Sequence, residues 1–302
     1  MPLSVDEAIA RVPIWANAND LKVTPLDGGI TNSNFRIDAG EESFALRIAG
    51  ANTNLLGIDR SHEYAANLAA GKLGIAPEVV YVIQPEGYLV TRFISARPFP
   101  LEEITQPENI RRVMELIRKI HSMPDIPGEF SVFHVVESYT GIARRYKVDF
   151  PPNFDQVIRR MEEAHSALLA RPEPLRPCHN DLLNANFLIG DRIYILDWEY
   201  AGMGDIFFDL ANFSDNHELS DAQDLWMLEC YFGTVTDRQI THLKIMKVLS
   251  DLREAMWGLV QIGLSELDFD YRGYSNKFFA RVFEKMNDPH WDQWIKEMQK
   301  DG

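Results

Sequence analysis

The amino-acid sequence predicts an α+β chain with two lobes, a small antiparallel-sheet N-lobe and a larger helical C-lobe. Residues 1–94 contain short runs in which apolar and polar residues alternate, as they do in half-buried strands. From residue 97 onward the apolar positions recur at the 3.6-residue period of a helix. The composition is that of an ordinary globular protein, and 302 residues suffice for two lobes. We therefore expect the N-lobe at residues 1–94 and the C-lobe at residues 95–302.

Five strands and one helix are expected in the N-lobe. Turn-forming residues separate the strands, and a Gln-Pro-Glu-Gly stretch predicts a hairpin between the last two. The helix begins at Asp59, is rich in Ala and Leu, and is stopped by Gly74 and Pro77. The expected ranges are 22–26, 34–37, 43–48, 79–83 and 88–93 for the strands and about 59–73 for the helix.

The C-lobe is expected to be mainly helical, with helices at residues 107–121, 153–169 and 238–264. The first of these helices carries an apolar stripe typical of a buried face: Ile110, Val113, Met114, Ile117 and Ile120. Two short apolar runs, residues 187–189 and 193–196, predict a tight hairpin with a two-residue turn.

The charge balance excludes some classes of partner. Lys and Arg number 30 against 45 Asp and Glu, which gives a net charge of −15. This excess repels phosphate backbones and anionic lipid, so we expect neither nucleic acid nor a membrane as a partner, whereas a cationic substrate is suited to it. Cys178 and Cys230 are expected to be buried thiols. No apolar run approaches the ~20 residues of a membrane span and the N-terminus lacks a signal core, so we expect a cytoplasmic protein.

One loop carries the residue types that phosphoryl transfer needs. It contains His179-Asn180-Asp181 and, five residues after the aspartate, Asn186. Asp197 follows where the expected hairpin ends. This spacing matches the catalytic loop and the later metal-binding aspartate of kinases.

The chemistry explains these residue types. Phosphoryl transfer requires a carboxylate that orients the attacking hydroxyl and takes its proton, and Mg²⁺ prefers hard oxygen ligands. We predict Asp181 as the base, Asn186 and Asp197 as ligands of Mg²⁺, and ATP as the phosphate donor. The alternative is that these residues only hydrogen-bond their own loop. The complete constellation, with an apolar hairpin between Asn186 and Asp197, favours the kinase interpretation.

The region from His179 to Asp209 resembles the choline/ethanolamine kinases, which are relatives of the aminoglycoside phosphotransferases. The matching residues are His179-Asn180-Asp181-Leu182-Leu183, Asn186, Asp197-Trp198-Glu199-Tyr200 and Phe208-Asp209. The resemblance implies an ATP- and Mg²⁺-dependent kinase with a two-lobed protein-kinase-like fold. We expect Asp209 to brace the catalytic loop by hydrogen bonds.

In the family that the chain resembles, a Gly-Gly loop between two N-lobe strands covers the nucleotide phosphates. Residues 28–34 read Gly-Gly-Ile-Thr-Asn-Ser-Asn, and we expect Thr31 and Asn32 to bind nucleotide, because glycines let backbone N–H groups approach oxygens closely. Taken alone, without the resemblance, these residues favour an ordinary hairpin turn. The main chain from Thr91 to Phe93 ends the last strand, and we expect it to hydrogen-bond adenine.

Arg47 lies on the third expected strand, where protein kinases carry a lysine. It is placed to pair with Glu63 on the following helix and to reach the α- and β-phosphates. The alternative is a surface arginine and a surface glutamate that never meet. An arginine at this position resembles the choline kinases more than the aminoglycoside enzymes, which usually carry lysine.

A quaternary ammonium substrate needs aromatic faces with acids nearby, because it has no N–H to donate. Residues 255–260 resemble the Trp-Gly-Leu-Trp segment of the family's choline pocket, with Trp257 as the cation platform and Val260 in place of the second tryptophan. Asp215 or Glu266 is expected to supply the acidic group. Choline or ethanolamine is thus the predicted small amino-alcohol substrate.

Two alternatives are open. An aminoglycoside or another small-hydroxyl compound would need several carboxylates in the C-lobe to meet multiple ammonium groups. A nucleotide-binding pseudokinase or scaffold would be expected to have lost a member of the Asp181, Asn186 and Asp197 set, and all three are present.

Overall fold

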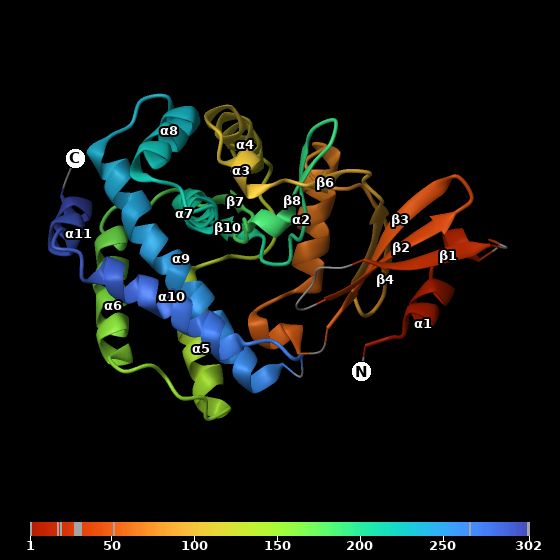
Figure 1. Ribbon diagram of the computed structural model, residues 1–302, viewed down its shortest axis with the longest axis horizontal. Coiled ribbons are helices and arrows are strands. Elements are labelled where there is room, and N and C mark those ends of the chain that lie inside the picture. Colours follow the sequence, from red (N-terminus) through yellow and green to blue (C-terminus); the bar gives the residue numbers. More distant parts are fainter. Residues whose placement is uncertain are drawn as a thin grey trace. The chain divides into compact units, whose positions relative to one another are not determined.

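The computed structural model describes residues 2–16, 18, 20–26, 32–50, 52–265 and 267–300. Its contacts divide the chain into two compact units (Figure 1). The first unit comprises Met1–Phe99, Ile126–Gly128 and Ala185–Ala201; the second comprises Pro100–Asp125, Glu129–Asn184 and Gly202–Gly302. The first unit thus contains the expected N-lobe and, in addition, the segment with the second hairpin. The catalytic-loop residues are divided by this boundary, because Asp181 belongs to the second unit, whereas Asn186 and Asp197 belong to the first.

A five-stranded antiparallel sheet with the order β1-β2-β3-β5-β4 forms the body of the first unit (Figure 1). Its strands are β1 (Leu21–Leu26), β2 (Asn32–Ala39), β3 (Glu42–Ala49), β4 (Val79–Ile83) and β5 (Tyr88–Arg92). All five coincide with expected strands. The register places Arg47 of β3 opposite Asn34 of β2 and opposite Leu89 of β5. Alternate residues of β3, such as Phe44 and Leu46, are buried in the core of this unit. This burial explains why apolar and polar residues alternate in its sequence.

Helix α2 (Arg60–Lys72) is the helix expected after the third strand. Asp59 caps it, and its carboxylate accepts hydrogen bonds from the backbone N–H groups of Ser61 at 2.8 Å and His62 at 3.3 Å. The helix ends before Gly74, whose φ of +68° lies in the left-handed region that favours glycine. The glutamate of the first turn, Glu63, faces inward and is buried.

Three short helical segments of the first unit were not expected from the sequence: α1 (Val5–Ala10), η1 (Pro13–Trp15) and η2 (Thr53–Leu56). A capping box formed by Ser4 and Glu7 begins α1. Trp15 packs edge-on against Phe44, with ring centroids 5.7 Å apart. Segments of three to six residues are too short for a helical period to show, so packing on the sheet stabilises them.

A second sheet of the first unit, in the order β6-β8-β9, contains the expected hairpin. Its strands are β6 (Arg97–Pro98), β8 (Phe187–Ile189) and β9 (Ile193–Ile195). The register pairs Ile189 with Ile193, so residues 190–192 connect the two strands. The prediction of a two-residue turn is therefore wrong. The backbone N–H of Gly190 donates to the carbonyl of Arg192 at 3.0 Å, which closes a three-residue turn.

The second unit is mainly helical. Its helices are α3 (Leu101–Ile104), α4 (Pro107–Ile120), α5 (Val132–Arg145), α6 (Phe154–Leu169), α7 (Ile206–Asn216), α8 (Asp221–Phe232), α9 (Asp237–Leu264), α10 (Tyr271–Met286) and α11 (Trp291–Gln299). The strands β7 (Arg176–Cys178) and β10 (Gly202–Gly204) pair with each other, and a short η3 (Asn184–Asn186) spans the boundary of the units. The helices expected at 107–121, 153–169 and 238–264 correspond to α4, α6 and α9.

Helix α9 is the central element of this unit and packs against α5, α7 and α10 (Figure 1). It is buried almost continuously from Thr241 to Gln261, unlike a surface helix with one polar face. Gly258 lets α10 approach closely, because a Cβ atom at this position would lie 3.0 Å from the Cβ of Ser275. Side chains on α9, including those of Arg253 and Trp257, are therefore held firmly by packing.

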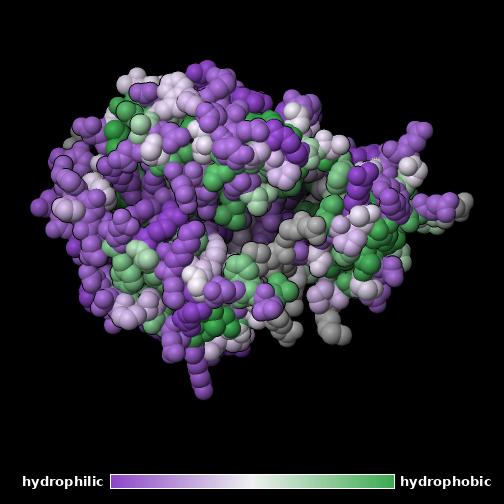
Figure 2. Space-filling model, in the orientation of Figure 1, coloured by the Kyte–Doolittle hydropathy of each residue, from purple (hydrophilic) through white to green (hydrophobic). Residues whose placement is uncertain are grey.

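The surface agrees with the composition, and so does one of the two cysteines. Hydrophilic side chains cover most of the visible face of the helical unit in Figure 2. Among the described residues, no helix is both long enough and apolar enough to span a bilayer. Both cysteines are free thiols; Cys178 is buried, and Cys230 is half-buried rather than buried as expected.

Candidate functional site

In the first unit, β3, α2 and the segment after β9 together form a cluster of charged side chains. Arg47 on β3 forms an ion pair with Glu63 on α2. The Nη1 atom of Arg47 also lies 2.5 Å from Oδ1 of Asp197. The expected pairing of the strand arginine with the helix glutamate is thus present, and the alternative that they never meet is excluded. The role of Arg47 in phosphate binding stays a prediction.

Three further residues extend this cluster, and two of them were missed in the sequence. Arg60 Nη1 lies 2.6 Å from Glu63 Oε2 and 3.3 Å from Glu199 Oε2. Asn32, which was predicted, donates from Nδ2 to the same Glu199 oxygen at 3.1 Å. Glu199 stands in the matched Asp-Trp-Glu motif, which was the available signal for it. For Arg60, the only indication in the sequence that it belongs to this cluster was its position three residues before Glu63.

The cluster has an excess of negative charge. Two guanidinium groups, those of Arg47 and Arg60, face the three carboxylates of Glu63, Asp197 and Glu199. Burial raises the pKa of Glu199, and Asp197 raises it further against the opposing arginines. Burial likewise lowers the pKa of Arg60. A divalent cation would relieve this imbalance.

The hairpin β8-β9 has the two predicted metal ligands at its open end, with Asn186 directly before β8 and Asp197 shortly after β9. The backbone N–H of Leu196 donates to the carbonyl of Asn186 at 2.8 Å, and Asp197 is the next residue. Asp197 has a φ of 63°, in the left-handed region that non-glycine residues rarely adopt. An amide oxygen and a carboxylate oxygen are hard donors, and the Asp197 side chain is 31% exposed. These residues therefore fit Mg²⁺.

The main chain from Thr91 to Phe93, which was predicted to hydrogen-bond adenine, takes part in the sheet. The backbone N–H of Phe93 donates to the carbonyl of Ser43 at 2.9 Å, so it is already used within the sheet. Thr91 lies inside β5 and is paired with Ala45 on one side and Val79 on the other. Hydrogen bonding in the ladders therefore leaves this stretch few main-chain donors for a base.

Two predicted residues lie outside the described part of the chain. They are Thr31, with the rest of the glycine loop at residues 27–31, and Glu266. Their predicted contacts with nucleotide and substrate stay predictions.

In the second unit, helix α7 holds the loop that carries Asp181. Asp209 accepts hydrogen bonds from the backbone N–H groups of His179 at 2.8 Å and Asn180 at 2.6 Å. One turn later, Asn212 accepts from the N–H of Leu182 at 2.6 Å. The expected bracing by Asp209 is thus confirmed, whereas Asn212 was missed. Burial opposes ionisation of Asp209, but hydrogen bonds and the neighbouring histidines outweigh it and lower the pKa of this carboxyl.

The Asp209 carboxylate also belongs to a group of three side chains that lie as close together as the ligands of a metal ion. His121, Cys178 and Asp209 offer ligand atoms within 4.8 Å of one another, and all three are buried. His121 is already bonded, through Nε2 to Asp209 at 3.0 Å and through Nδ1 to Tyr231 at 2.7 Å. Burial and the charge of Asp209 raise the pKa of the Cys178 thiol well above its usual value, which disfavours the thiolate that a metal needs. We assign this group a bracing role.

Asp181 itself is buried beside a cation that the sequence did not reveal. Its Oδ1 atom lies 3.1 Å from Nη1 of Arg253 on α9, and the Arg253 side chain is 2% exposed. Arg253 also forms an ion pair with the adjacent Glu254. The Tyr274 hydroxyl on α10 donates to Glu254 Oε2 at 2.6 Å. The predicted base thus lies at one end of a chain of four polar side chains, of which only Tyr274 is partly exposed.

Trp257, the predicted cation platform, lies one turn further along α9 within an aromatic group. Tyr271 and Tyr274 pack against its ring at centroid distances of 5.9 and 5.5 Å, and Phe269 contacts both tyrosines. Val260, which replaces a second tryptophan, is buried in the core. Aromatic surface is therefore supplied from the start of α10 rather than from α9 alone.

Asp215 lies in a different environment from the one predicted for it. Its Oδ1 atom is 2.8 Å from Lys285, 3.3 Å from Arg281 and 3.7 Å from Lys247. Three cations thus already neutralise this carboxylate, which argues against its use for a substrate ammonium. Asp251 shares two of these cations; burial and the neighbouring Asp215 raise its pKa to about 6. The acid that is linked to the aromatic group is instead Glu254, through Tyr274.

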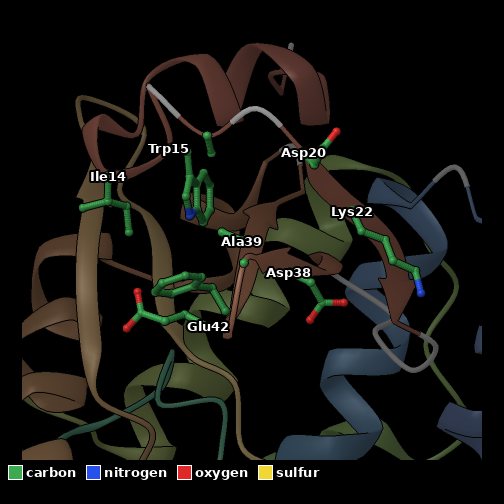
Figure 3. A pocket seen from close by; sticks show the side chains of 10 residues that line it. Ile14, Trp15, Asp20, Lys22, Asp38, Ala39 and Glu42 are labelled. Atoms are coloured by element: carbon green, nitrogen blue, oxygen red, sulfur yellow. The ribbon is translucent and has the colours of Figure 1, made fainter.

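A separate hollow on the first unit contains none of the predicted site residues (Figure 3). Trp15 and Phe44 line it, together with acidic residues of β2 and β3. Two of those acids are already paired, Asp38 with Arg36 at 2.7 Å and Glu42 with Arg92. It offers no set of residues for phosphoryl transfer, so we do not regard it as the active site.

Comparison with known proteins matches most of the chain. The family model for choline/ethanolamine kinase matches residues 23–224. Protein LicA of Haemophilus influenzae is 28% identical over 259 residues, covering 81% of this chain and 75% of that protein. Ethanolamine kinase 1 of Homo sapiens is 26% identical over a 317-residue alignment, covering 90% of this chain and 69% of that protein. A crystal structure of a choline/ethanolamine kinase family protein from Mesorhizobium loti is 33% identical with a TM-score of 0.83, covering 97% of this chain and 98% of that one.

Proposed function

Because the chain belongs to the choline/ethanolamine kinase family of alcohol-group phosphotransferases, we propose that it transfers the γ-phosphate of ATP to the hydroxyl of choline or ethanolamine with the help of Mg²⁺. The observation that carries this proposal is the backbone hydrogen bond from Leu196 to Asn186, which brings the main chain before Asp197 next to Asn186 and so supports a shared role for these two hard oxygen donors. The ion pair of Arg47 with Asp197 supports it, because the same carboxylate then lies beside the arginine that we propose as a phosphate contact.

The charged cluster of the first unit supplies the proposed nucleotide contacts. Arg47 would contact the α- and β-phosphates while Glu63 fixes its orientation. Arg60 has two buried nitrogens, Nε and Nη2, without a hydrogen-bond partner among the described residues, so it retains donors for an anion. Asn186 and Asp197 would hold Mg²⁺, which when bound neutralises charge on the β- and γ-phosphates. Asn32 would keep Glu199 oriented beside them.

Asp181 is the proposed base. The substrate oxygen forms the new P–O bond while the bond between the γ-phosphorus and the β–γ bridging oxygen breaks. ADP leaves with that electron pair, and the hydroxyl proton passes to Asp181. The hydrogen bonds from His179, Asn180 and Leu182 to α7 hold the loop in one conformation, which is the preorganisation that such a transfer needs.

We favour choline over ethanolamine. A trimethylammonium binds through aromatic faces and needs no acceptor, and Trp257 is surrounded by Tyr271 and Tyr274. A primary ammonium would instead need hydrogen-bond acceptors. Both carboxylate oxygens of Glu254 already accept hydrogen bonds, one from Arg253 and the other from Tyr274. An aminoglycoside is disfavoured because the carboxylates of Asp215 and Asp251 are neutralised by lysine and arginine. Since ATP is the donor, we propose the cytoplasm as the location.

A coupled ADP-release assay on the purified protein tests this proposal. Choline, ethanolamine, an aminoglycoside panel and simple sugars would be compared with and without Mg²⁺. We expect turnover with choline, a lower kcat/KM with ethanolamine, and none of either without a divalent cation. Turnover only with an aminoglycoside or a sugar would contradict the proposed substrate, and no turnover with any alcohol would contradict the proposed activity.

A further inference from the structure

Asp181 shares its buried surroundings with Arg253, which projects from the central helix α9. The two side chains approach to 3.1 Å, and both are almost inaccessible to solvent. We infer that Arg253 is a positioning residue that holds the base Asp181 in its reactive orientation, with Glu254 balancing its charge. This inference rests on the function proposed above, because it concerns the same proton transfer.

Charge balance alone does not explain the contact. Burying a guanidinium is costly unless a carboxylate neutralises it, and the neighbouring Glu254 already does so for Arg253. The carboxylate of Asp181 is therefore an additional partner beyond the one that Arg253 needs for stability. Glu254 is in turn fixed by the Tyr274 hydroxyl, and burial together with the Glu254 charge raises the pKa of that phenol, so it stays a donor.

The geometry suits the control of orientation. A guanidinium is planar and rigid, so a carboxylate oxygen that binds it loses rotational freedom. Arg253 lies on the part of α9 that is buried on all sides, where packing fixes its backbone. Asp181 is thus restrained from two directions within the second unit, at its backbone by the loop that α7 braces and at its carboxylate by α9. When the substrate proton arrives, Asp181 becomes neutral while Arg253 keeps Glu254 as its counter-charge.

The test uses the full-length protein with choline and ATP. Arg253→Ala removes the guanidinium, and we expect kcat to fall roughly 10²-fold, the loss that a small misplacement of a reacting group causes, with the KM for ATP changed less than threefold. Arg253→Lys keeps the charge without the planar fork and should lose about threefold to tenfold. Guanidinium or ethylguanidinium, added to the alanine variant below unfolding concentrations, should restore at least tenfold of the lost kcat.

The matched control is Arg238→Ala, on the same helix, which removes hydrogen bonds to the carbonyls of Met298 and Arg171. It should keep the wild-type kcat and gain nothing from guanidinium. Thermal unfolding is measured for each variant. If the alanine variant does not fold, the kinetic test relies on the lysine variant, which keeps a buried cation. A folded Arg253→Ala protein with wild-type kcat, or with a loss that guanidinium does not restore, would overturn the positioning role while leaving the proposed function intact. A wild type without turnover would overturn the function itself and this inference with it.

Discussion

The backbone N–H of Leu196 donates to the carbonyl of Asn186 at 2.8 Å. This bond fixes the main chain at the open end of the hairpin. Asp197 comes next, in a left-handed conformation with a φ of 63°. Such a conformation costs a non-glycine residue about 1–3 kcal/mol, and it persists only where the surroundings enforce it. The strained backbone belongs to the residue whose carboxylate we propose as a metal ligand. This coincidence supports a functional role for Asp197.

Replacing Asp197 by Ala should raise the Mg²⁺ concentration for half-maximal rate by roughly tenfold or more and also lower kcat, because the substitution removes a proposed metal ligand. The measurement is a Mg²⁺ titration of the ADP-release rate at saturating ATP. Asp191→Ala is the control, since this aspartate belongs to the turn of the same hairpin and its side chain is 73% exposed. Equal Mg²⁺ titration curves for wild type and Asp197→Ala would show that Asp197 does not bind the metal.

Arg47→Ala should raise the KM for ATP at least roughly tenfold while the KM for choline changes little, because the guanidinium is proposed to contact phosphates. Arg47→Lys should give an intermediate value, since an ammonium keeps the charge but loses the planar fork. Arg36→Ala is the control on the neighbouring strand, where the arginine pairs with Asp38. Because Glu63 loses a partner, the stability of each variant is measured beside its kinetics. A KM for ATP that stays constant in both Arg47 variants would refute the proposed contact.

The long elements and the catalytic loop were predictable from the sequence because their signals are local. The apolar stripe of α4 and the spacing from Asp181 to Asn186 are set by neighbouring residues. Arg60 and Arg253 were not predictable, because their roles come from partners far along the chain, such as Glu199 and Asp181. Periodicity carries no information about which buried arginine meets which carboxylate.

Two of the predictions, for Asp215 and for Phe93, took no account of pairings that the fold makes. Asp215 was predicted near the substrate because it is acidic, but Lys247 on α9 and Lys285 on α10 neutralise it, and only tertiary packing brings them there. Phe93 was predicted to bind adenine because the last strand ends there, but its N–H is used by Ser43 of the neighbouring strand. A sequence shows the donors and acceptors of a segment and leaves open which of them the fold has already paired.

Asp181→Asn should lower kcat by ~10²–10⁴-fold, because the amide keeps the shape of the side chain but cannot take the proton. ATP binding should change little, which equilibrium titration with a fluorescent nucleotide measures. Asp205→Asn is the control, since Asp205 caps α7 by accepting the N–H of Phe207 at 2.9 Å and is outside the proposed machinery. An Asp181→Asn variant that keeps more than about a tenth of the wild-type kcat would exclude the role of general base.

Stability should fall with acid through His217. Burial lowers the pKa of this imidazole from 6.5 to about 4, against the opposing hydrogen bond to Phe213. The unfolded chain thus binds more protons than the folded one between these values, so the contribution of His217 is complete above pH 6.5 and is lost as the pH falls toward 4. At ~1.4 kcal/mol per pKa unit, the loss is about 3 kcal/mol.

His217→Asn tests this dependence, because the shorter amide retains a donor for the Phe213 carbonyl. Urea unfolding of both proteins would be measured at several pH values from 7 to 4. The free energy of unfolding of the variant should fall less steeply with acid than that of the wild type, by about 2–3 kcal/mol over this range. Parallel curves for the two proteins would mean that His217 titrates normally in the folded state.

Trp257→Ala should raise the KM for choline by about twofold to thirtyfold, because a cation over an indole face is worth ~0.5–2 kcal/mol. The KM for ATP should change less. Trp257→Phe should recover part of the loss, since a phenyl ring keeps a weaker negative face for the trimethylammonium. The buried position of Trp257 against Tyr271 and Tyr274 means that truncation also costs packing, so thermal unfolding must be measured for both variants. Trp294→Ala is the control, because its ring makes a cation–π contact with Lys244, 5.4 Å from the ring centroid, and does not belong to the aromatic group around Trp257. A stable Trp257→Ala protein with the wild-type KM for choline would rule out this indole as the cation platform and shift the assignment to the two tyrosines.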